Sequence, residues 1–362
     1  MRSAAYKQMR ERLVNAAKTQ KKPILGHFEL TARCNLDCKM CYVHTQDNAA
    51  ALRRELSTEQ WKKIFDEAVE NEMLYASLSG GECLIRKDFK ELYLHLWNKQ
   101  VMITVMSNGT LINDDYVDFF KTYKPDMIQI SLYGSSEDGY LQLAGHTGFE
   151  KAIAAISALQ EAGIDVRVAI TPSKYMTDDY INTIRLCKEK GFYLMLNDMA
   201  LVPNRENPEK DDYYLSEDEI FSLRKQRAEL DHTLVPVENT PEPFGPMNEI
   251  LPNGLTCNAG NCLATVTWDG KMYPCLNAMV GGYSLLEMSY AEAWAKTKEA
   301  ASQVVQGIEC AGCAYEKTCP KCPFLRLKGL HSGHCNTDVC EMTRKLVAAG
   351  IKMLKTSVEP AE

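Results

Sequence analysis

The chain has 362 residues, a net charge of −7, 45% hydrophobic residues and 25% charged residues. These values are ordinary for a globular protein and leave room for one large α/β domain and a smaller one. The negative charge argues against nucleic acid or an anionic membrane as the main partner. Because no apolar run suits a signal peptide or a membrane span, we expect a cytoplasmic protein. In that reducing compartment the fourteen cysteines indicate metal or redox use and not disulfides.

Residues 1–23 contain an amphipathic run, 3–19, which predicts a short N-terminal helix. Over 24–202, strand-like and helical patterns alternate. Six βα units predict a parallel sheet with right-handed crossovers, and six strands are too few for a closed eight-stranded barrel. We therefore expect an α/β fold with a partial (β/α)6 TIM-type barrel, whose chemistry lies at the C-terminal ends of the strands. The predicted strands are 24–30, 74–79, 101–106, 127–132, 164–170 and 193–198, and the predicted helices are 57–71, 87–100, 114–123, 149–162 and 178–190.

Three cysteines, Cys34, Cys38 and Cys41, follow the first predicted strand at x3 and x2 spacing. Three thiolates can hold three irons of a four-iron cluster and leave the fourth iron open to bind and reduce a small molecule. The alternative is a zinc knuckle with His44 as its fourth ligand. Such a knuckle would not need a βα barrel around it, so the spacing favours a reactive cluster.

A glycine pair with a carboxylate, Gly80, Gly81 and Glu82, follows the second predicted strand. Glycines there let the backbone approach a ligand closely, and a carboxylate can accept hydrogen bonds from an ammonium group. The next residue, Cys83, is expected to pack under the loop. Cys187, on the apolar face of a predicted helix, is expected in the core.

Polar residues follow the later predicted strands. Ser107 and Asn108 follow the third, Ser131 follows the fourth, and Thr171 and Met199 follow the fifth and sixth. Hydroxyl and amide groups there could bind a ribose or a carboxylate. The alternative is turn formation, which Asn-Gly strongly favours.

The rest of the chain divides into three segments. Residues 203–256 hold twelve acidic and five basic residues, seven prolines and one predicted helix, 216–230, and are interpreted as a connecting arm across the surface. Residues 257–345 are dense in cysteine and predict a small domain folded around metal. Residues 346–362 complete a helix predicted over 341–354 and a tail. The cysteines of the array are Cys257, Cys262, Cys275, Cys310, Cys313, Cys319, Cys322 and Cys340, with Cys335 beside them.

The CxxxCxxC loop, with Tyr42 directly after it and the Gly-Gly-Glu segment one βα unit later, resembles the radical S-adenosylmethionine (radical SAM) superfamily. The resemblance implies that the open iron chelates SAM and that the Gly-Gly-Glu segment binds its amino group. It also implies reductive cleavage of SAM to a 5′-deoxyadenosyl radical, which abstracts hydrogen from a substrate. The implied SAM contacts are Tyr42, Gly80, Gly81, Glu82, Ser107, Asn108, Ser131, Thr171 and Met199.

The C-terminal array resembles the SPASM extension of these enzymes, which carries two auxiliary four-iron clusters. The resemblance implies three [4Fe–4S] clusters in total. Cys340 is favoured over Cys335 as the last ligand, because a helix is predicted to start directly after it. The spacing before Cys322 is x2 where the family has x3, which leaves its partner open, and zinc is the rival metal for the array. The implied ligand sets are Cys257, Cys262, Cys275 and Cys322 for one cluster and Cys310, Cys313, Cys319 and Cys340 for the other.

Two substrate classes stay open. The preferred one is a peptide or protein that is crosslinked, joined by a thioether, oxidised or epimerised, and the alternative is a small molecule such as a sugar or cyclitol. Leu276 stands where the similar sulfatase-maturating enzymes have an aspartate base, which disfavours that oxidation. The segment before Cys34 is too short for a peptide-recognition domain, so a peptide substrate would call for a separate recognition protein. An external donor such as ferredoxin or flavodoxin is expected, and the residue that acts on the substrate is unknown.

Overall fold

The computed structural model describes residues 4–43, 47–196, 204–205, 212–231, 257–303, 337–349 and 357–358. A ten-stranded sheet forms its centre, in the order β10-β6-β5-β4-β3-β2-β1-β7-β8-β9. The first six strands pair in parallel with their sequence neighbours, which confirms the predicted partial barrel. They are β1 (Leu25–Glu29), β2 (Tyr75–Ser79), β3 (Met102–Ser107), β4 (Met127–Ser131), β5 (Val166–Ile170) and β6 (Leu194–Leu196).

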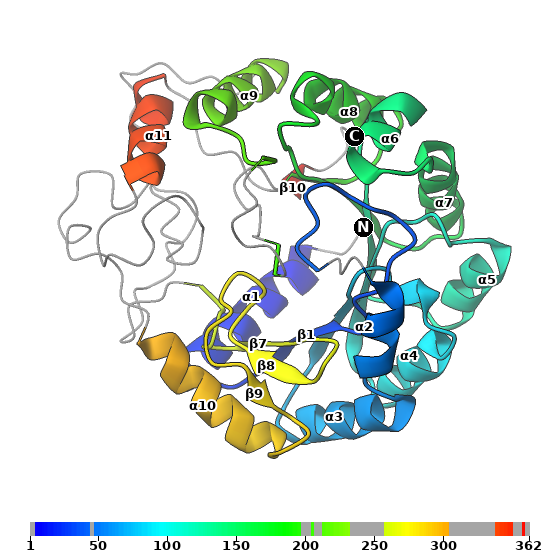
Figure 1. The fold of residues 1–362 in the computed structure, drawn as a ribbon, viewed down its shortest axis with the longest axis vertical. Helices are drawn as coiled ribbons and strands as arrows, with labels where there is room; N and C mark the ends of the chain where they lie inside the picture. Colours follow the sequence, from blue (N-terminus) through cyan, green and yellow to red (C-terminus); the bar gives the residue numbers. More distant parts are fainter. Residues whose placement is uncertain are drawn as a thin grey trace.

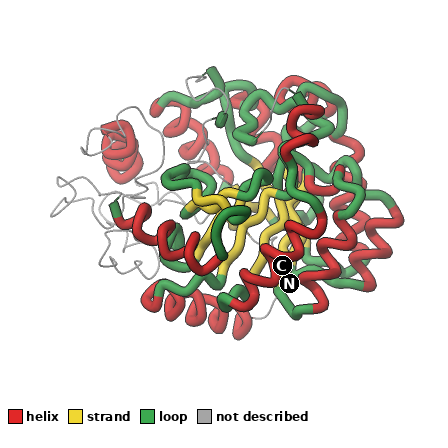
Figure 2. Tube along the Cα trace, turned by 60° about the horizontal axis from the view of Figure 1, so that its bottom comes forward, coloured by secondary structure: helices red, strands yellow, loops and turns green. Residues whose placement is uncertain are grey.

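Helices surround the sheet, as Figures 1 and 2 show from two directions. The predicted helices are present as α1 (Ala4–Gln20), α3 (Thr58–Glu70), α4 (Phe89–Asn98), α5 (Asp114–Thr122), α7 (Phe149–Glu161), α8 (Thr177–Glu189) and α9 (Glu217–Leu230). Three further helices were not predicted: α2 (Asn48–Arg54), α6 (Glu137–Ala144) and α10 (Tyr290–Ser302), together with the 3₁₀ turn η1 (Cys83–Ile85).

Alternation along β1 separates an apolar outside from a polar inside. Phe28 packs edge-on against Trp61 and Phe65 of α3, with ring centroids 6.2 and 5.0 Å away. Because successive side chains point to opposite faces of a strand, His27 and Glu29 face the barrel interior. Their register partners on β2 are Ser77 and Ser79, so the interior is polar beside the mouth of the barrel.

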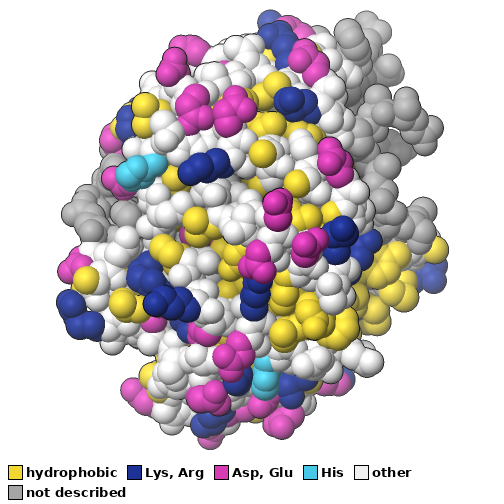
Figure 3. Space-filling view, turned by 90° about the vertical axis from the view of Figure 1, so that its right-hand side faces the viewer, with side chains coloured by type: hydrophobic (Ala, Val, Ile, Leu, Met, Phe, Trp, Pro, Cys, Tyr) yellow, Lys and Arg dark blue, Asp and Glu magenta, His cyan; other side chains and the backbone are white. Residues whose placement is uncertain are grey.

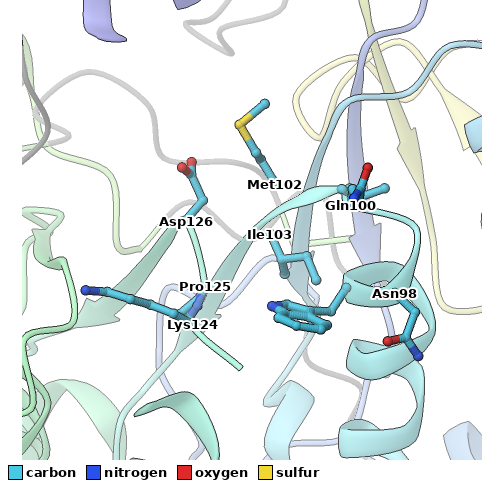
Figure 4. A pocket seen from close by; sticks show the side chains of 9 residues that line it. Asn98, Gln100, Met102, Ile103, Lys124, Pro125 and Asp126 are labelled. Atoms are coloured by element: carbon cyan, nitrogen blue, oxygen red, sulfur yellow. The ribbon is translucent and has the colours of Figure 1, made fainter. Parts of the chain in front are cut away.

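Helix α1 lies at the N-terminal ends of the strands. The Tyr6 hydroxyl donates to Asp126 Oδ1 over 3.0 Å, and the Arg10 guanidinium lies 4.9 Å from the Tyr75 ring centroid. A cavity of about 560 Å³ opens at the same end (Figure 4). It is therefore on the side of the barrel away from the cysteine loop. Its lining residues are Trp97, Asn98, Gln100, Val101, Met102, Ile103, Lys124, Pro125 and Asp126.

The sheet continues beyond the boundary expected at residue 257. β7 (Leu263–Val266) pairs in parallel with β1, and β8 (Lys271–Tyr273) and β9 (Tyr283–Ser284) follow antiparallel. At the other edge, β10 (Ser357–Val358) pairs antiparallel with β6. The first part of the cysteine-rich segment is thus built onto the barrel sheet.

The predicted start of the last helix is wrong. Helix α11 covers Thr337–Ala348, so Cys340 lies in its first turn and does not precede it. This removes the reason for preferring Cys340 over Cys335, which lies outside the described residues.

No helix in the described ranges is long and apolar enough to cross a membrane. Figure 3 shows basic and acidic side chains interspersed over one face of the molecule, so this face carries no single-signed charged patch.

Candidate functional site

The three-cysteine loop follows β1, at the C-terminal end of the barrel, as predicted. The Cys41 amide donates to the Cys38 carbonyl over 3.0 Å, and the Leu36 amide donates to Cys34 Sγ over 3.4 Å. Burial raises the pKa of Cys34 to about 12 and that of Cys38 well above its usual value, and the neighbouring thiols raise both further. A positively charged metal centre would favour the deprotonated form of these buried thiols.

The donor types of this loop suit an iron–sulfur cluster. Among the residues that the structure describes, no three His, Cys, Asp or Glu side chains are grouped to hold one metal ion. In a four-iron cluster each cysteine binds a different iron, so its sulfurs need not converge on one point. The all-thiolate donor set fits iron–sulfur ligation, and the His44 of the zinc alternative lies outside the described residues.

The Gly-Gly-Glu segment binds the backbone of the cysteine loop. The Gly81 amide donates to the Thr31 carbonyl over 2.8 Å, and the Glu82 amide donates to the Arg33 carbonyl over 2.9 Å. A Cβ on Gly80 would lie 2.3 Å from the Thr31 oxygen, and one on Gly81 would lie 2.3 Å from the Arg33 oxygen. We expected these glycines to let the backbone approach a ligand closely. In the structure they let it approach the backbone that leads into the cysteine loop.

The Glu82 carboxylate is fully buried and already has donors. It accepts from the amides of Leu84 and Asn108, over 3.0 and 2.7 Å, and from the Ser107 hydroxyl over 3.0 Å. Burial raises its pKa, and these hydrogen bonds oppose the rise. Through these bonds the carboxylate ties β2 to β3.

Two further cysteines lie where they were predicted. Cys83 is buried, and its thiol donates to the Met106 carbonyl over 3.3 Å. Cys187 is buried in the main core. Burial raises the pKa of both thiols, which makes them poor nucleophiles.

Asn108 connects the end of β3 to the cysteine loop. Its Nδ2 donates to Asn35 Oδ1 over 3.0 Å and lies 3.9 Å from Cys34 Sγ, within hydrogen-bonding range of a sulfur. Its Oδ1 accepts from the amide and hydroxyl of Thr110, over 2.9 and 2.7 Å. Asn108 and Ser107, both predicted SAM contacts, thus bind groups of the protein in this structure.

The later strand ends carry the remaining candidates. Ser131 and Thr171 are partly exposed at the ends of β4 and β5, while Met199 lies outside the described residues. Burial raises the pKa of Tyr133 and of Cys38, and hydrogen bonding from Ser131 and Tyr133 respectively opposes these rises. The end of β4 therefore also reaches a cysteine of the loop.

Part of the acidic connecting segment lies at this site and not only on the surface. Arg205 forms two hydrogen bonds to the Glu29 carboxylate, of 2.5 and 2.7 Å, and its guanidinium lies 5.3 Å from the Tyr42 ring centroid. Asn204 Nδ2 donates to the Cys41 carbonyl over 2.8 Å. The Arg205 amide donates to the Tyr42 carbonyl over 3.2 Å. Arg205 thus holds both the backbone and the ring of Tyr42, a predicted SAM contact.

Three of the predicted auxiliary-cluster cysteines are described. Cys257 and Cys275 pack partly buried against one small apolar cluster, whereas Cys262 is fully buried beside Ala17 and Ile24. Burial raises the pKa of Cys262 to about 12, and the nearby Cys257 raises it further. Cys310, Cys313, Cys319 and Cys322 lie outside the described residues, and of Cys340 only the helical backbone is described.

Sequence reasoning missed several residues that shape the loop, among them Asn35, Thr110 and Arg205. Asn35 lies inside the CxxxC spacing, and Thr110 follows the Asn-Gly turn, so both had a positional signal. Arg205 lies 176 residues from Glu29, and no local pattern could pair them.

Comparisons with known proteins agree with this geometry. The family model "Radical SAM superfamily" matches residues 28–187. A curated relative, the "AdoMet-dependent heme synthase" of Methanosarcina barkeri, is 25% identical over 83% of this chain and 91% of its own length. The subtilosin biosynthesis protein AlbA of Bacillus subtilis is 30% identical over 52% of this chain, but this match spans only 43% of AlbA.

Among solved structures, Streptococcus suis SuiB bound to its precursor peptide SuiA matches with a TM-score of 0.67. That match covers 94% of this chain and 82% of SuiB at 16% identity, so it supports the fold. The three cysteines of the loop and the Gly-Gly-Glu segment lie within residues 28–187, so this part of the chain matches the radical SAM superfamily.

Proposed function

We propose that this protein uses a cluster at Cys34, Cys38 and Cys41 and bound SAM to take a hydrogen atom from a peptide or protein substrate. The observation that carries the proposal is the three-thiol loop held by the Gly-Gly-Glu segment at the C-terminal end of the barrel. When bound, such a cluster supplies the electron that cleaves SAM to the 5′-deoxyadenosyl radical.

The chain's own residues position this chemistry. The backbone of Gly81 and Glu82 fixes the start of the loop, and Arg205 fixes its end at Tyr42. Ser131 and Thr171 are partly exposed at strand ends and remain our candidates for contact with SAM, as does the backbone of the Gly-Gly-Glu segment. Ser107 and Asn108 would not contact SAM themselves. Ser107 would position Glu82, and Asn108 would position the cysteine loop.

We further propose two auxiliary [4Fe–4S] clusters on the C-terminal array. Of its described cysteines, Cys262 directly precedes β7 and Cys275 follows β8 by two residues, so a cluster there would be attached to the barrel sheet. The open spacing at Cys322 and the helical position of Cys340 leave the final ligand to experiment. The enzyme would work in the cytoplasm with a donor such as ferredoxin or flavodoxin and, for a peptide substrate, with a separate recognition protein.

Peptide modification is the substrate class that we prefer. AlbA is named for the biosynthesis of the bacteriocin subtilosin, and SuiB was solved with a precursor peptide. Crosslinking, thioether formation, oxidation and epimerisation all begin with loss of one hydrogen atom, so this fold supports each of them.

A small-molecule substrate is the second candidate. One curated relative, aligned over most of both chains, is named a heme synthase. This favours the small-molecule class, although its named product is a porphyrin and not the sugar or cyclitol considered from the sequence.

The decisive experiment measures 5′-deoxyadenosine released by the anaerobically reconstituted protein with SAM and a reductant. One set of reactions receives short peptides encoded beside the gene, and the other receives porphyrin precursors of heme. We expect a peptide both to stimulate release and to change in mass. Stimulation by a porphyrin alone would establish the second candidate, and no release with the cluster present would refute both.

A further inference from the structure

The side-chain amide of Asn108 is buried against the cysteine loop, with 4% of the residue exposed. Resting on the cluster proposed above, we infer that this amide donates an N–H···S hydrogen bond to Cys34 Sγ and so raises the reduction potential of the SAM-binding cluster. Asn108 would then be a residue that tunes the cluster and not a contact to SAM.

The orientation of the amide follows from its partners. An amide oxygen and nitrogen look alike in outline, so their assignment depends on the hydrogen-bond network. Here the Thr110 amide can only donate, and it lies 2.9 Å from Asn108 Oδ1. The Thr110 hydroxyl lies 2.7 Å from the same atom. The nitrogen must therefore be the atom that faces Asn35 and Cys34.

The number of available protons supports the same assignment. Nδ2 carries two hydrogens and no usable lone pair. One hydrogen goes to Asn35 Oδ1 over 3.0 Å, and Cys34 Sγ lies 3.9 Å away for the other. The backbone amide of Asn108 is taken by Glu82 over 2.7 Å. No donor of this residue is left for a ribose or a carboxylate.

The direction of the effect follows from charge. Reduction adds an electron to a cluster whose sulfurs are already negative, and a donor aimed at a sulfur stabilises the reduced form more than the oxidised form. Removing the donor should therefore make reduction harder and move the potential to more negative values.

A second side chain supplies an independent test of the same physics. Burial raises the pKa of Cys38, the next cysteine of the loop, and the Tyr133 side chain opposes this rise as a hydrogen-bond donor. Its ring packs edge-on against Tyr140, with centroids 5.4 Å apart. The Tyr140 hydroxyl is buried and has no hydrogen-bond partner within the described part of the chain. The same substitution at these two neighbouring tyrosines removes a donor to sulfur in one case only.

The test compares N108L, Y133F and the control Y140F with the wild type, each as the full chain with its clusters reconstituted. The readout is a potentiometric titration followed by electron paramagnetic resonance. Only the signal that changes when SAM is added is followed, because this separates the radical cluster from auxiliary ones. N108S is a second variant, because an apolar leucine could disturb iron loading among these polar side chains. Serine is polar and shorter, and it lacks the amide N–H group that faces Cys34.

We expect the potential to become more negative in N108L, N108S and Y133F and to stay at the wild-type value in Y140F. An unchanged potential in both Asn108 variants would overturn the inference. An equal shift in Y140F would also overturn it, since it would attribute the change to packing. If the wild type shows no SAM-sensitive signal at all, the proposed function fails instead, so the two failures can be told apart.

Discussion

Replacing Arg205 by glutamine would leave the Glu29 carboxylate without its guanidinium partner. The Glu29 side chain has no exposed surface, and that of Arg205 is 18% exposed, so water replaces the lost partner poorly. Breaking a buried ion pair by removing one partner typically costs about 3–5 kcal/mol. We expect R205Q to lose free energy of unfolding in this range.

Anaerobic urea unfolding, followed by tryptophan fluorescence, would measure this loss for R205Q, E29Q and the double variant. The double variant should be more stable than R205Q alone, because it buries no unpaired charge. The exposed pair between Lys22 and Glu72 provides the control, and K22Q should cost less than about 1 kcal/mol.

Two results would refute this reasoning. R205Q could unfold with the same midpoint as K22Q, which would mean that Glu29 is well hydrated without its partner. Alternatively, the double variant could lose the sum of the two single losses, which would mean that the two side chains do not interact.

Three other changes have expected outcomes. Replacing Cys34, Cys38 and Cys41 together by alanine should abolish 5′-deoxyadenosine formation, measured by liquid chromatography, and continued cleavage would contradict the assigned loop. Iron and sulfide analysis after reconstitution should approach ~12 irons per chain for three [4Fe–4S] clusters; ~4 irons, or stoichiometric zinc, would remove the auxiliary clusters. Gly81→Ala should lower the free energy of unfolding by about 3 kcal/mol, because its Cβ overlaps the Arg33 oxygen. Gly163→Ala, which meets nothing within 4 Å, should cost only the ~1 kcal/mol of its positive φ; equal urea midpoints would argue against a close contact at Gly81.

The barrel could be predicted from the sequence because its signals are local. The strands are short apolar runs at regular intervals, and helix starts such as Ser57, with its capping box to Gln60, are readable from spacing alone. The same signal was present but missed at Ser289 and Glu292, where α10 begins. The start of α11 was misjudged because it was inferred from a ligand pattern and not from Thr337 and Asp338, whose residue types are common at helix N-termini.

The contacts within the site could not be predicted in the same way. The sequence placed Asn108 at the correct strand end, but its partners come from the loop after β1 and from the turn after β3. Which of its atoms face a ligand and which face the protein depends on the register of three strands. The pairing of Arg205 with Glu29 is likewise a contact between residues far apart in the sequence, and no local pattern indicates it.

The pairing of β7 with β1 affects how this protein can be dissected. Phe28 and Val266 are register partners, and the Leu25 amide donates to the Cys262 carbonyl over 2.9 Å. A chain that ends before Cys257 would lack β7. It would therefore expose the hydrogen-bonding edge of β1, the strand that leads into the cysteine loop. Open edges of this kind recruit other strands and promote aggregation. Inactivity of such a truncated chain would therefore not reveal what the auxiliary clusters do, and point substitutions of their cysteines are the sounder tool.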